Sequence, residues 1–339
     1  MKRKLSILML LLLTVSGWAQ QKQTVYAVAF YNLENLFDTE RDPTVNDVDF
    51  TPGGSYAWTA DKYQKKLNNM AYAISHLAKE YTPDGFAFLG VSEVENRKVL
   101  EDLTHTGALD SIGYGIVHYD SPDPRGIDVA LIYNPKLFTV VSSRVYHYQM
   151  PEEPKFRTRD QLLVNGIMGG EKVHVIVNHW PSRRGGNKSS YTREFAAKIA
   201  KGIADSLYQA DPTSKVIIMG DLNDDPTNAS VKKVLGAKSK TKDVPPGGFF
   251  NPFEGILKKG IGSLFYQGNW NLFDQIMVSQ NFLKPDNGLR FWKAEVFNRD
   301  FLIQKEGAYK GYPLRTFSGT RFQNGYSDHF PTIVYFVKE

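Results

Sequence analysis

The chain has 339 residues, no cysteine and a formal net charge of +5 at neutral pH. Without cysteine it can form neither disulfides nor a cysteine-linked lipid anchor, so its stability must come from a packed core, and its length allows a large one. Lys2, Arg3 and Lys4 supply three of the positive charges, which leaves about +2 for the rest of the chain. That bias is too small to identify a polyanionic partner.

The first twenty residues have the pattern of a secretory signal peptide. Three basic residues precede an apolar run over residues 5–15, which is short for a membrane-spanning segment. The small residues Ser16, Gly17 and Ala19 follow, as they do at a cleavage site. We expect residues 1–19 to be a signal peptide and the protein to be exported, either to the periplasm or to the medium.

The remainder, residues 24–339, is predicted to form one α/β domain, because short β-branched runs alternate with loops and a few helices, without a repeat or a linker. Apolar spacing predicts a helix over 61–79, with Thr59 as its N-cap, and a second helix over 192–208. Strands are predicted over 25–31, 86–91, 129–133, 173–178, 216–219, 276–278 and 332–337. Most of these runs are apolar on both faces, which indicates sheets that are covered on both sides.

Residues 245–268 are the least regular stretch and carry aromatic side chains among glycines: Phe249, Phe250, Phe253, Phe265 and Tyr266. A membrane-touching hairpin or a lid over a substrate would use such a segment. No apolar tip flanked by basic residues is present, which favours an irregular loop packed onto the domain.

Six apolar segments carry an acid, an amide or an imidazole at or near one end. In chain order these residues are Asn32 and Glu34, Glu93, His179, Asp221 and Asn223, Asp274, and Asp328 and His329. Side chains at strand ends can converge on one rim when two sheets pack face to face. Carboxylate and amide oxygens are hard ligands that suit Mg²⁺ or Ca²⁺.

Several other catalytic classes lack their motifs in this chain. There is no histidine pair at zinc spacing, no Gly-x-Ser-x-Gly turn and no Gly-x-x-x-x-Gly-Lys loop. A hard cation, imidazoles and several acids together favour hydrolysis of a phosphoester by an activated water.

The ordered set of segments, from Asn32 to Phe336, resembles the endonuclease/exonuclease/phosphatase superfamily, which has the fold of deoxyribonuclease I. The specific blocks are Gly-Asp-Leu-Asn at 220–223 and Ser-Asp-His at 327–329. The segments Tyr-Asn-Leu-Glu-Asn-Leu-Phe-Asp at 31–38 and Asn-His-Trp-Pro-Ser-Arg-Arg-Gly-Gly at 178–186 are similar to a secreted bacterial branch. The resemblance implies a four-layer sandwich of two packed, mostly antiparallel β-sheets flanked by helices, with the site at their common rim.

The resemblance also implies a set of metal ligands. Glu93 corresponds to the principal metal carboxylate, and Asn32 to an amide that helps bind the metal or the phosphate. Glu34 is a further metal candidate, at a position where relatives often carry Asp or another polar residue. Asp328 would support the metal shell.

The remaining motif residues correspond to catalytic positions. Asp221 would orient or deprotonate the attacking water, and Asn223 would hold a phosphate oxygen. His329 would contact the scissile phosphate, with Asp274 fixing its tautomer. His179 lies where the deoxyribonuclease branch has a second catalytic imidazole and exonuclease III-like members have none. Which histidine is the acid and which the base stays open.

Basic residues near these motifs are candidate substrate contacts. Arg183 and Arg184 follow His179 in a glycine-rich loop with Lys188, where they could hold backbone phosphates or form a solvated turn. Arg125 could reach the substrate phosphate, but for it, as for Arg157 and Arg159, a structural ion pair explains the residue equally well. The other histidines have no motif around them and are interpreted as structural or surface residues: His76, His105, His118, His147 and His174.

We therefore expect an exported phosphodiesterase that depends on Mg²⁺, with Mn²⁺ or Ca²⁺ as alternatives, and that acts on DNA or RNA as an endonuclease. The main alternative is a phosphoesterase for lipid or inositol phosphate head groups. A protein that only binds a phosphorylated ligand is disfavoured, because no motif position has been lost. Neither a membrane anchor nor an obligate protein partner is implied.

Overall fold

The computed structural model describes residues 23–184, 186, 188–286 and 288–339. The expected signal peptide over residues 1–19 lies outside the described residues, and so does the side chain of Lys188. Among the helices that are described, none is both long enough and apolar enough to pass through a bilayer.

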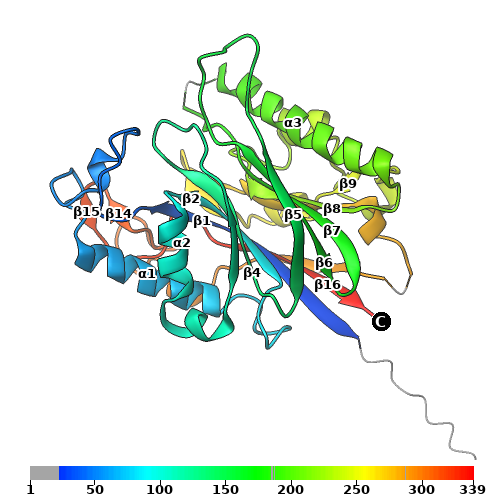
Figure 1. The fold of residues 1–339 in the computed structure, drawn as a ribbon, viewed down its shortest axis with the longest axis horizontal. Coiled ribbons are helices and arrows are strands. Elements are labelled where there is room, and N and C mark those ends of the chain that lie inside the picture. Colours follow the sequence, from blue (N-terminus) through cyan, green and yellow to red (C-terminus); the bar gives the residue numbers. More distant parts are fainter. Residues whose placement is uncertain (1–22, 185, 187, 287) are drawn as a thin grey trace, which may run out of the picture.

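Two six-stranded sheets lie face to face and form the centre of the molecule (Figure 1). The first has the strand order β13-β16-β1-β2-β4-β3, and the second has the order β5-β6-β7-β8-β12-β9. One neighbouring pair in each sheet is parallel, β1 with β2 and β7 with β8, and the other pairs are antiparallel. The expected sandwich of mostly antiparallel sheets is confirmed.

The strands of the first sheet are β1 (Thr24–Leu36), β2 (Phe88–Val94), β3 (Gly115–His118), β4 (Asp128–Tyr133), β13 (Arg290–Val296) and β16 (Thr332–Lys338). Those of the second are β5 (Phe138–Tyr146), β6 (Gln161–Met168), β7 (Glu171–His179), β8 (Lys215–Asp221), β9 (Phe249–Phe250) and β12 (Asp274–Ser279). Two small hairpins pair β10 (Leu264–Tyr266) with β11 (Asn269–Asn271) and β14 (Phe317–Ser318) with β15 (Arg321–Phe322).

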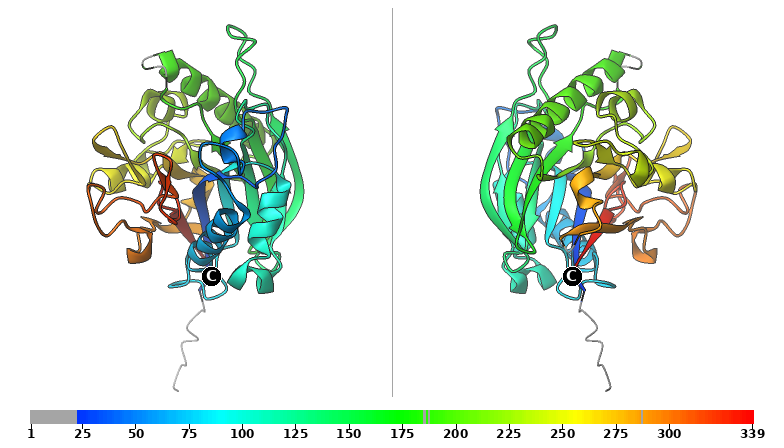
Figure 2. Two further views of the ribbon diagram at one scale, coloured as in Figure 1. Left: turned by 90° about the vertical axis from the view of Figure 1, so that its left-hand side faces the viewer. Right: turned by 90° about the vertical axis from the view of Figure 1, so that its right-hand side faces the viewer.

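The helices form the outer layers, with α1 and α2 on one flank of the sandwich and α3 on the other (Figure 2). They are α1 (Ala60–Ser75), α2 (Arg97–Thr104), α3 (Lys188–Ala210) and α4 (Phe253–Leu257). Short 3₁₀ segments occupy Val48–Phe50, Gly107–Ile112, Thr241–Asp243, Gln280–Phe282 and Asp300–Leu302, and a π-helical turn occupies Ser230–Val234.

Helix α1 begins where its cap was predicted, because the side chain of Thr59 accepts a hydrogen bond from the backbone N–H of Lys62. It ends at Ser75, earlier than the predicted 79, and Ala78 in the following turn has a positive φ of 63°. Helix α3 begins at Lys188 rather than at 192. Polar residues of its first turn hid that start, because they lack the apolar spacing on which the prediction rested.

Alternate residues of the central strands face two different cores, as the period of two in a strand requires. Val175, Val177 and Met219 pack between the sheets, whereas Ile176 and Ile218 pack under α3. This explains why these strands read as apolar on both faces. The sheets approach so closely that a Cβ added at Gly90 of β2 would lie 2.6 Å from Sδ of Met219 in the facing sheet.

Residues 245–268 contain β9, α4 and β10 and pack onto the domain. Phe249, Phe250 and Phe253 are buried, so for them the packed-loop interpretation is confirmed. Phe265 and Tyr266 differ, because both remain partly exposed and each lines a cavity.

Candidate active site

Three neighbouring strands of the second sheet place three of the predicted residues in one row. His179 lies opposite Asp221 in the parallel pair β7–β8, and Asp221 lies opposite Asp274 in the antiparallel pair β8–β12. Side chains at directly opposed positions point to the same face, with Cβ atoms about 5 Å apart. All three are buried. The register alone therefore brings an imidazole and two carboxylates together at the ends of the strands.

The first sheet contributes Asn32 from β1 and Glu93 from β2. The amide nitrogen Nδ2 of Asn32 donates a hydrogen bond to Oδ2 of Asp221 over 3.0 Å, which joins the rims of the two sheets. Oε2 of Glu93 accepts a hydrogen bond from the backbone N–H of Asn35 at 3.1 Å, and Oε1 lies 3.8 Å from Nε2 of His179. Residues from five strands and both sheets thus meet at one point.

Backbone strain is concentrated beside this point. Glu34, Glu93 and Asn223 have φ values of +49°, +59° and +49°, in the left-handed region that non-glycine residues rarely adopt. Each such residue costs on the order of 1–3 kcal/mol unless local contacts compensate, and strain of this kind gathers at functional sites.

His329 enters the site from the segment that precedes β16. Its Nδ1 lies 2.6 Å from Oδ2 of Asp274, and Oγ of Ser263 donates to the same oxygen at 2.5 Å. Burial lowers the pKa of His329, but the negative charges of Asp274, Asp221 and Asp328 outweigh it and hold this pKa well above its ordinary value. The protonated form of His329 is therefore favoured, and its Nε2 lies 3.9 Å from Oδ2 of Asp221.

The pKa of His179 is shifted in the opposite direction. Burial, together with the positive charges of Arg159, Arg125 and His329, lowers its pKa well below the ordinary value. Its Nε2 lies 3.6 Å from Oδ2 of Asp221. Burial raises the pKa of Asp221 to about 6, against the opposing effect of the His329 charge. A carboxylate therefore lies between two imidazoles whose pKa values are shifted in opposite directions, and environments that separate the pKa values of neighbouring groups are typical of acid–base catalysis.

Asn223 follows Asp221 in the loop after β8. The backbone N–H of Asn223 donates to Oδ1 of Asp221 at 2.9 Å, and its amide Nδ2 donates to the carbonyl of Trp180 at 2.9 Å. A carboxamide carries two N–H donors, so one donor remains for a phosphate oxygen.

These side chains line an open cavity of about 560 Å³, which we call the catalytic cleft. Of the predicted residues, the following line it: Glu93, Arg125, His179, Asp221, Asn223, Asp328 and His329. Asn32 and Asp274 lie directly behind its wall, through their hydrogen bonds to Asp221 and His329. The structure therefore brings together nearly all of the residues that the motifs had singled out.

A hard divalent cation fits the oxygen atoms on the Glu93 side of the cleft. Among the described residues, Oε1 of Glu93 has Arg125 and His179 as ion-pair partners, at 4.0 and 3.8 Å, and Oδ1 of Asn32 accepts a hydrogen bond from the backbone N–H of Glu34. A carbonyl oxygen has two lone pairs, so Asn32 keeps one for a cation. Asp221, Asp274 and His329 also place ligand atoms within 4.8 Å of one another. In that group, however, Asp274 and His329 are already bonded to each other, which favours Glu93 and Asn32.

Glu34, the further metal candidate, is bonded to internal partners, and its role as a metal ligand stays a prediction. Both of its carboxylate oxygens are used inside the protein: Oε1 accepts from Nε of Arg315 at 3.0 Å, and Oε2 from the backbone N–H of Thr316 at 2.6 Å. Burial, with the nearby charge of Asp328, raises the pKa of Glu34 to about 7. Glu34 therefore anchors the segment that carries Arg315. Arg315 in turn holds Oδ2 of Asp328 at 3.0 Å, which leaves only Oδ1 of Asp328 for the expected support of a metal shell.

The two arginines expected to bind substrate differ. Arg125 lines the cleft and is partly exposed, with Nη1 4.0 Å from Glu93. Arg183 does not line it: Nε donates to the carbonyl of Asn223, Nη2 donates to Asn228, and the guanidinium lies 4.3 Å from the ring centre of Phe273. Arg183 therefore holds the loop after β8, and its contact with substrate stays a prediction.

Sequence reasoning missed two residues that shape the site. Ser263, whose hydroxyl bonds Asp274, lies in the irregular stretch, where no motif marks it. Arg315, which joins Glu34 to Asp328, has no motif around it either. Arg159 had been considered, and it lies buried in the cleft wall, where Nε donates to the carbonyl of His179 and Nη1 pairs with Asp123 at 2.9 Å.

The other described histidines lie outside the catalytic cleft. His118 pairs with Asp128 at 2.9 Å, His147 with Asp160 at 2.7 Å, and His174 with the side chain of Asn165 at 2.7 Å. His76 and His105 each bond a backbone carbonyl four residues earlier, at 2.8 Å. These contacts agree with the structural interpretation of all five.

Comparison with known proteins matches the chain to a family model. The model, described as Endonuclease/Exonuclease/phosphatase family, matches residues 27–338. A comparison with curated proteins finds no match.

Solved structures with the same fold come from several organisms. D. rerio TDP2 complexed with single strand DNA product is 14% identical, with a TM-score of 0.54, covering 92% of this chain and 99% of that one. A family protein from Bacteroides thetaiotaomicron is 19% identical (TM-score 0.56; 94% and 99% covered). A mannosyl-6-phosphatase from the same organism is 18% identical (TM-score 0.56; 92% and 99% covered). At these identities the likeness shows a common fold and leaves the substrate open.

Proposed function

This chain belongs to the endonuclease/exonuclease/phosphatase family, and on that premise we propose that it is a divalent-metal-dependent phosphodiesterase that acts on nucleic acid as an endonuclease. The observation that carries the proposal is the arrangement around Asp221. Its Oδ2 lies 3.0 Å from Asn32 Nδ2, 3.6 Å from His179 Nε2 and 3.9 Å from His329 Nε2, in an open cleft that also contains Glu93.

In this proposal Glu93 and Asn32 hold the cation, with Mg²⁺ as the first choice and Mn²⁺ or Ca²⁺ as alternatives. Their hard oxygen atoms suit these ions. When bound, a divalent cation neutralises charge on a phosphate and helps to stabilise the transition state of its hydrolysis.

Two protons must move when water replaces the leaving oxygen. Asp221, with a pKa of about 6, is mainly ionised at neutral pH and accepts a proton from the attacking water. As the P–O bond to the leaving oxygen breaks, that oxygen takes the proton from Nε2 of His329, which Asp274 keeps charged and oriented. His179 and the free N–H of Asn223 bind the phosphate oxygens. Water and phosphodiester thus become a phosphomonoester and an alcohol.

A nucleic acid substrate is supported by the basic rim of the cleft. Arg125, Arg157 and Arg184 line it with exposed or partly exposed side chains. Exposed arginines in such a position suit backbone phosphates, which they contact without reading sequence. The likeness in fold to a TDP2 that was solved with single strand DNA product agrees with this choice.

We also propose that the protein is exported, on the strength of the basic and apolar pattern of residues 1–19. Cell fractionation with a C-terminal epitope tag tests this point. Retention of an uncleaved chain in the cytoplasm would contradict it.

A substrate panel tests the activity. The chain from residue 20 onward is incubated with plasmid DNA, a single-stranded oligonucleotide, RNA, sphingomyelin or inositol phosphates, each with Mg²⁺ or with a chelator. We expect chelator-sensitive cleavage of nucleic acid with internal cuts. Release from the lipid or from inositol phosphates alone would favour the head-group alternative. Binding without turnover of any compound would favour a non-catalytic role.

A further inference from the structure

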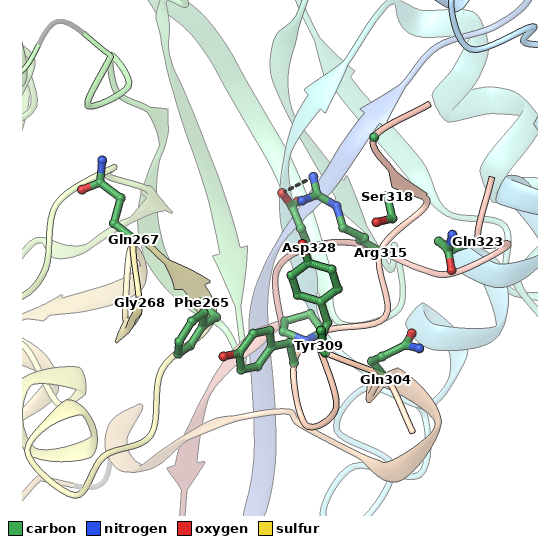
Figure 3. A pocket seen from close by; sticks show the side chains of 13 residues that line it. Phe265, Gln267, Gly268, Gln304, Tyr309, Arg315, Ser318, Gln323 and Asp328 are labelled. Carbon is green, nitrogen blue, oxygen red and sulfur yellow. Dashed lines mark hydrogen bonds and ion pairs between the residues drawn. The ribbon is translucent and has the colours of Figure 1, made fainter. Parts of the chain in front are cut away.

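A second cavity, of about 450 Å³, lies beside the catalytic cleft and plays no part in the chemistry described above (Figure 3). We call it the aromatic pocket. It is formed by the β10–β11 hairpin and by the segments around residues 304–323. Figure 3 shows Phe265 and Gln267 on one side, Gln304, Ser318 and Gln323 on the other, and the paired Arg315 and Asp328 between them.

The aromatic pocket and the catalytic cleft share a wall. Asp328 lines both cavities, and the next residue, His329, lines the cleft. Strand β10 serves both as well, since Phe265 lines the aromatic pocket and Tyr266 lines the cleft. Successive side chains of a strand point to opposite faces, so this division follows from the strand itself. The two cavities are therefore neighbours, separated by the wall that contains Asp328.

Aromatic rings form much of the pocket wall. Phe265 and Tyr312 stack on each other with ring centres 3.9 Å apart, and Trp270 supports both of them edge-on from 5.7 and 5.8 Å. Tyr309 packs less tightly, with its ring centre 6.1 Å from that of Tyr312, and is 61% exposed. A rigid aromatic stack with one accessible tyrosine suits a flat ring, because stacking needs an aromatic face and little else.

The charged side chains that line the aromatic pocket pair with each other. Among the described residues that line it, the charged ones are Arg315 and Asp328, and these pair with each other at 3.0 Å, while Arg315 also holds Glu34 at 3.0 Å. A second phosphate would find no uncommitted cation here.

The remaining polar groups are side-chain amides. Gln304 and Gln323 use their Nε2 atoms to donate to backbone carbonyls, at 3.0 and 3.4 Å, and Gln267 donates to the hydroxyl of Tyr266 at 3.2 Å. Within the described part of the chain, no donor is bonded to the carbonyl oxygens of these amides. They remain as acceptors for N–H groups of the kind that the edges of nucleobases present.

We propose that the aromatic pocket binds the base of a nucleotide that flanks the scissile phosphate, stacked on Tyr309 or on the Phe265–Tyr312 pair. A base can enter only when it is unstacked from its neighbours, so the pocket selects single-stranded or unpaired nucleotides over intact duplex. This inference rests on the proposed function, since the phosphate must lie in the catalytic cleft.

The experiment compares Tyr309→Ala with a matched control, Tyr119→Ala. Tyr119 is also exposed, at 40%, and it lines neither cavity. Because Tyr309 is 61% exposed, its truncation should leave the fold intact. The substrates are single-stranded oligonucleotides, the same oligonucleotides with an abasic residue on either side of the cleaved bond, and bis(4-nitrophenyl) phosphate, which carries no base.

For the unsubstituted protein we expect an abasic residue on one side to lower kcat/KM about tenfold, mainly through KM, as the loss of one stacked base does. In Tyr309→Ala the ratio of kcat/KM for the intact oligonucleotide to that for bis(4-nitrophenyl) phosphate should fall about tenfold, and the abasic penalty should shrink. Tyr119→Ala should keep both values. Equal cleavage of intact and abasic strands, or an unchanged ratio in Tyr309→Ala, would overturn the inference.

A binding measurement separates this inference from the proposed function. Adenosine and a hexose 6-phosphate are titrated by calorimetry into the unsubstituted protein and into Tyr309→Ala. Adenosine binding that is weakened in Tyr309→Ala supports the pocket even if no oligonucleotide is cleaved, in which case only the nuclease proposal fails. If adenosine does not bind, or only the sugar phosphate binds and Tyr309→Ala weakens it, the nucleobase assignment is wrong.

Discussion

Nδ1 of His329 lies 2.6 Å from Oδ2 of Asp274, although 55 residues separate the two in the chain. The strand β12 fixes Asp274, and the segment that leads into β16 fixes His329, so each sheet supplies one partner. The contact leaves Nε2 of His329 as the atom that faces the substrate. It also makes the charge of His329 dependent on a carboxylate that does not itself line the cleft.

Substitution of Asp274 by Asn should therefore impair catalysis more than binding. The amide cannot stabilise the imidazolium or fix its orientation, and we expect kcat to fall by about 10²- to 10³-fold with a smaller change in KM. Steady-state kinetics with bis(4-nitrophenyl) phosphate measures this. Asp300→Asn is the control, because the side chain of Asp300 is 99% exposed. Equal kcat values in the two variants would contradict the role of Asp274.

The pH dependence of kcat/KM should be bell-shaped. Activity should rise with pH through about 6 as Asp221 loses its proton, and fall at alkaline pH as His329 loses the proton that it must donate. Asp274→Asn removes the charge that raises the pKa of His329, so the alkaline limb should move to lower pH. An unchanged alkaline limb in this variant would mean that another group sets it.

The pairing of His329 with Asp274 should also make the free energy of unfolding depend on pH. The pKa of His329 is higher in the folded state than in the unfolded state, where it is about 6.5. The contribution of protonated His329 to the stability of the fold is therefore fully present below about pH 6.5. This contribution is lost as pH rises through the folded-state pKa of His329. The difference in Tm between the unsubstituted protein and His329→Gln should accordingly shrink at alkaline pH.

Arg183 and Arg125 should respond differently to truncation. Arg183→Ala removes the hydrogen bonds to Asn223 and Asn228, and we expect a loss of about 1–3 kcal/mol in the free energy of unfolding. Arg125→Ala should raise KM for an oligonucleotide several-fold with little effect on stability. Urea unfolding and steady-state kinetics, measured on both variants, test these two predictions. A stable Arg183→Ala with a raised KM would instead support Arg183 as a substrate contact.

The close approach of the sheets at Gly90 should make that position intolerant of a side chain. A Cβ there would meet Met219 at 2.6 Å and Phe30 at 3.1 Å, so Gly90→Ala should destabilise the fold by about 1–3 kcal/mol. Gly202 in α3 has nothing within 4 Å of an added Cβ. Gly202→Ala should therefore stabilise by about 0.5–1 kcal/mol. Thermal unfolding of both variants measures these two changes in stability. Equal changes in Gly90→Ala and Gly202→Ala would contradict the packing argument.

Most of the architecture was predictable from the sequence, because the central strands and the two long helices carry strong apolar patterns. Five strands of the two sheets were not predicted: β3, β5, β6, β9 and β13. Strand β5 lies at the edge of its sheet and much of it is exposed, so its sequence lacks a buried run. The convergence of the motif residues was also predictable, because each lies at the end of an element. The registers that align His179, Asp221 and Asp274 were not, since pairing between strands distant in sequence leaves no local signal.

Two of the predicted site residues have internal partners that the sequence did not indicate. Glu34 and Arg183 both lie in motif segments, yet Glu34 is bonded to Arg315, and Arg183 is bonded to the loop over residues 223–228. A sequence motif gives the residue type and its place along the chain. The direction in which a side chain points depends on its partners in the fold. For Glu34 and Arg183 these partners are distant in the chain, so the local sequence does not predict them.

The most direct test of the account is hydrolysis of bis(4-nitrophenyl) phosphate by three variants, Glu93→Gln, His329→Ala and Glu34→Gln, with Mg²⁺ binding followed by calorimetry. We predict that a chelator abolishes the activity of the unsubstituted protein, that His329→Ala loses the activity but still binds the cation, and that Glu93→Gln loses both. Glu34→Gln should keep most of its Mg²⁺ affinity. Undiminished, chelator-resistant hydrolysis in both Glu93→Gln and His329→Ala would contradict the account.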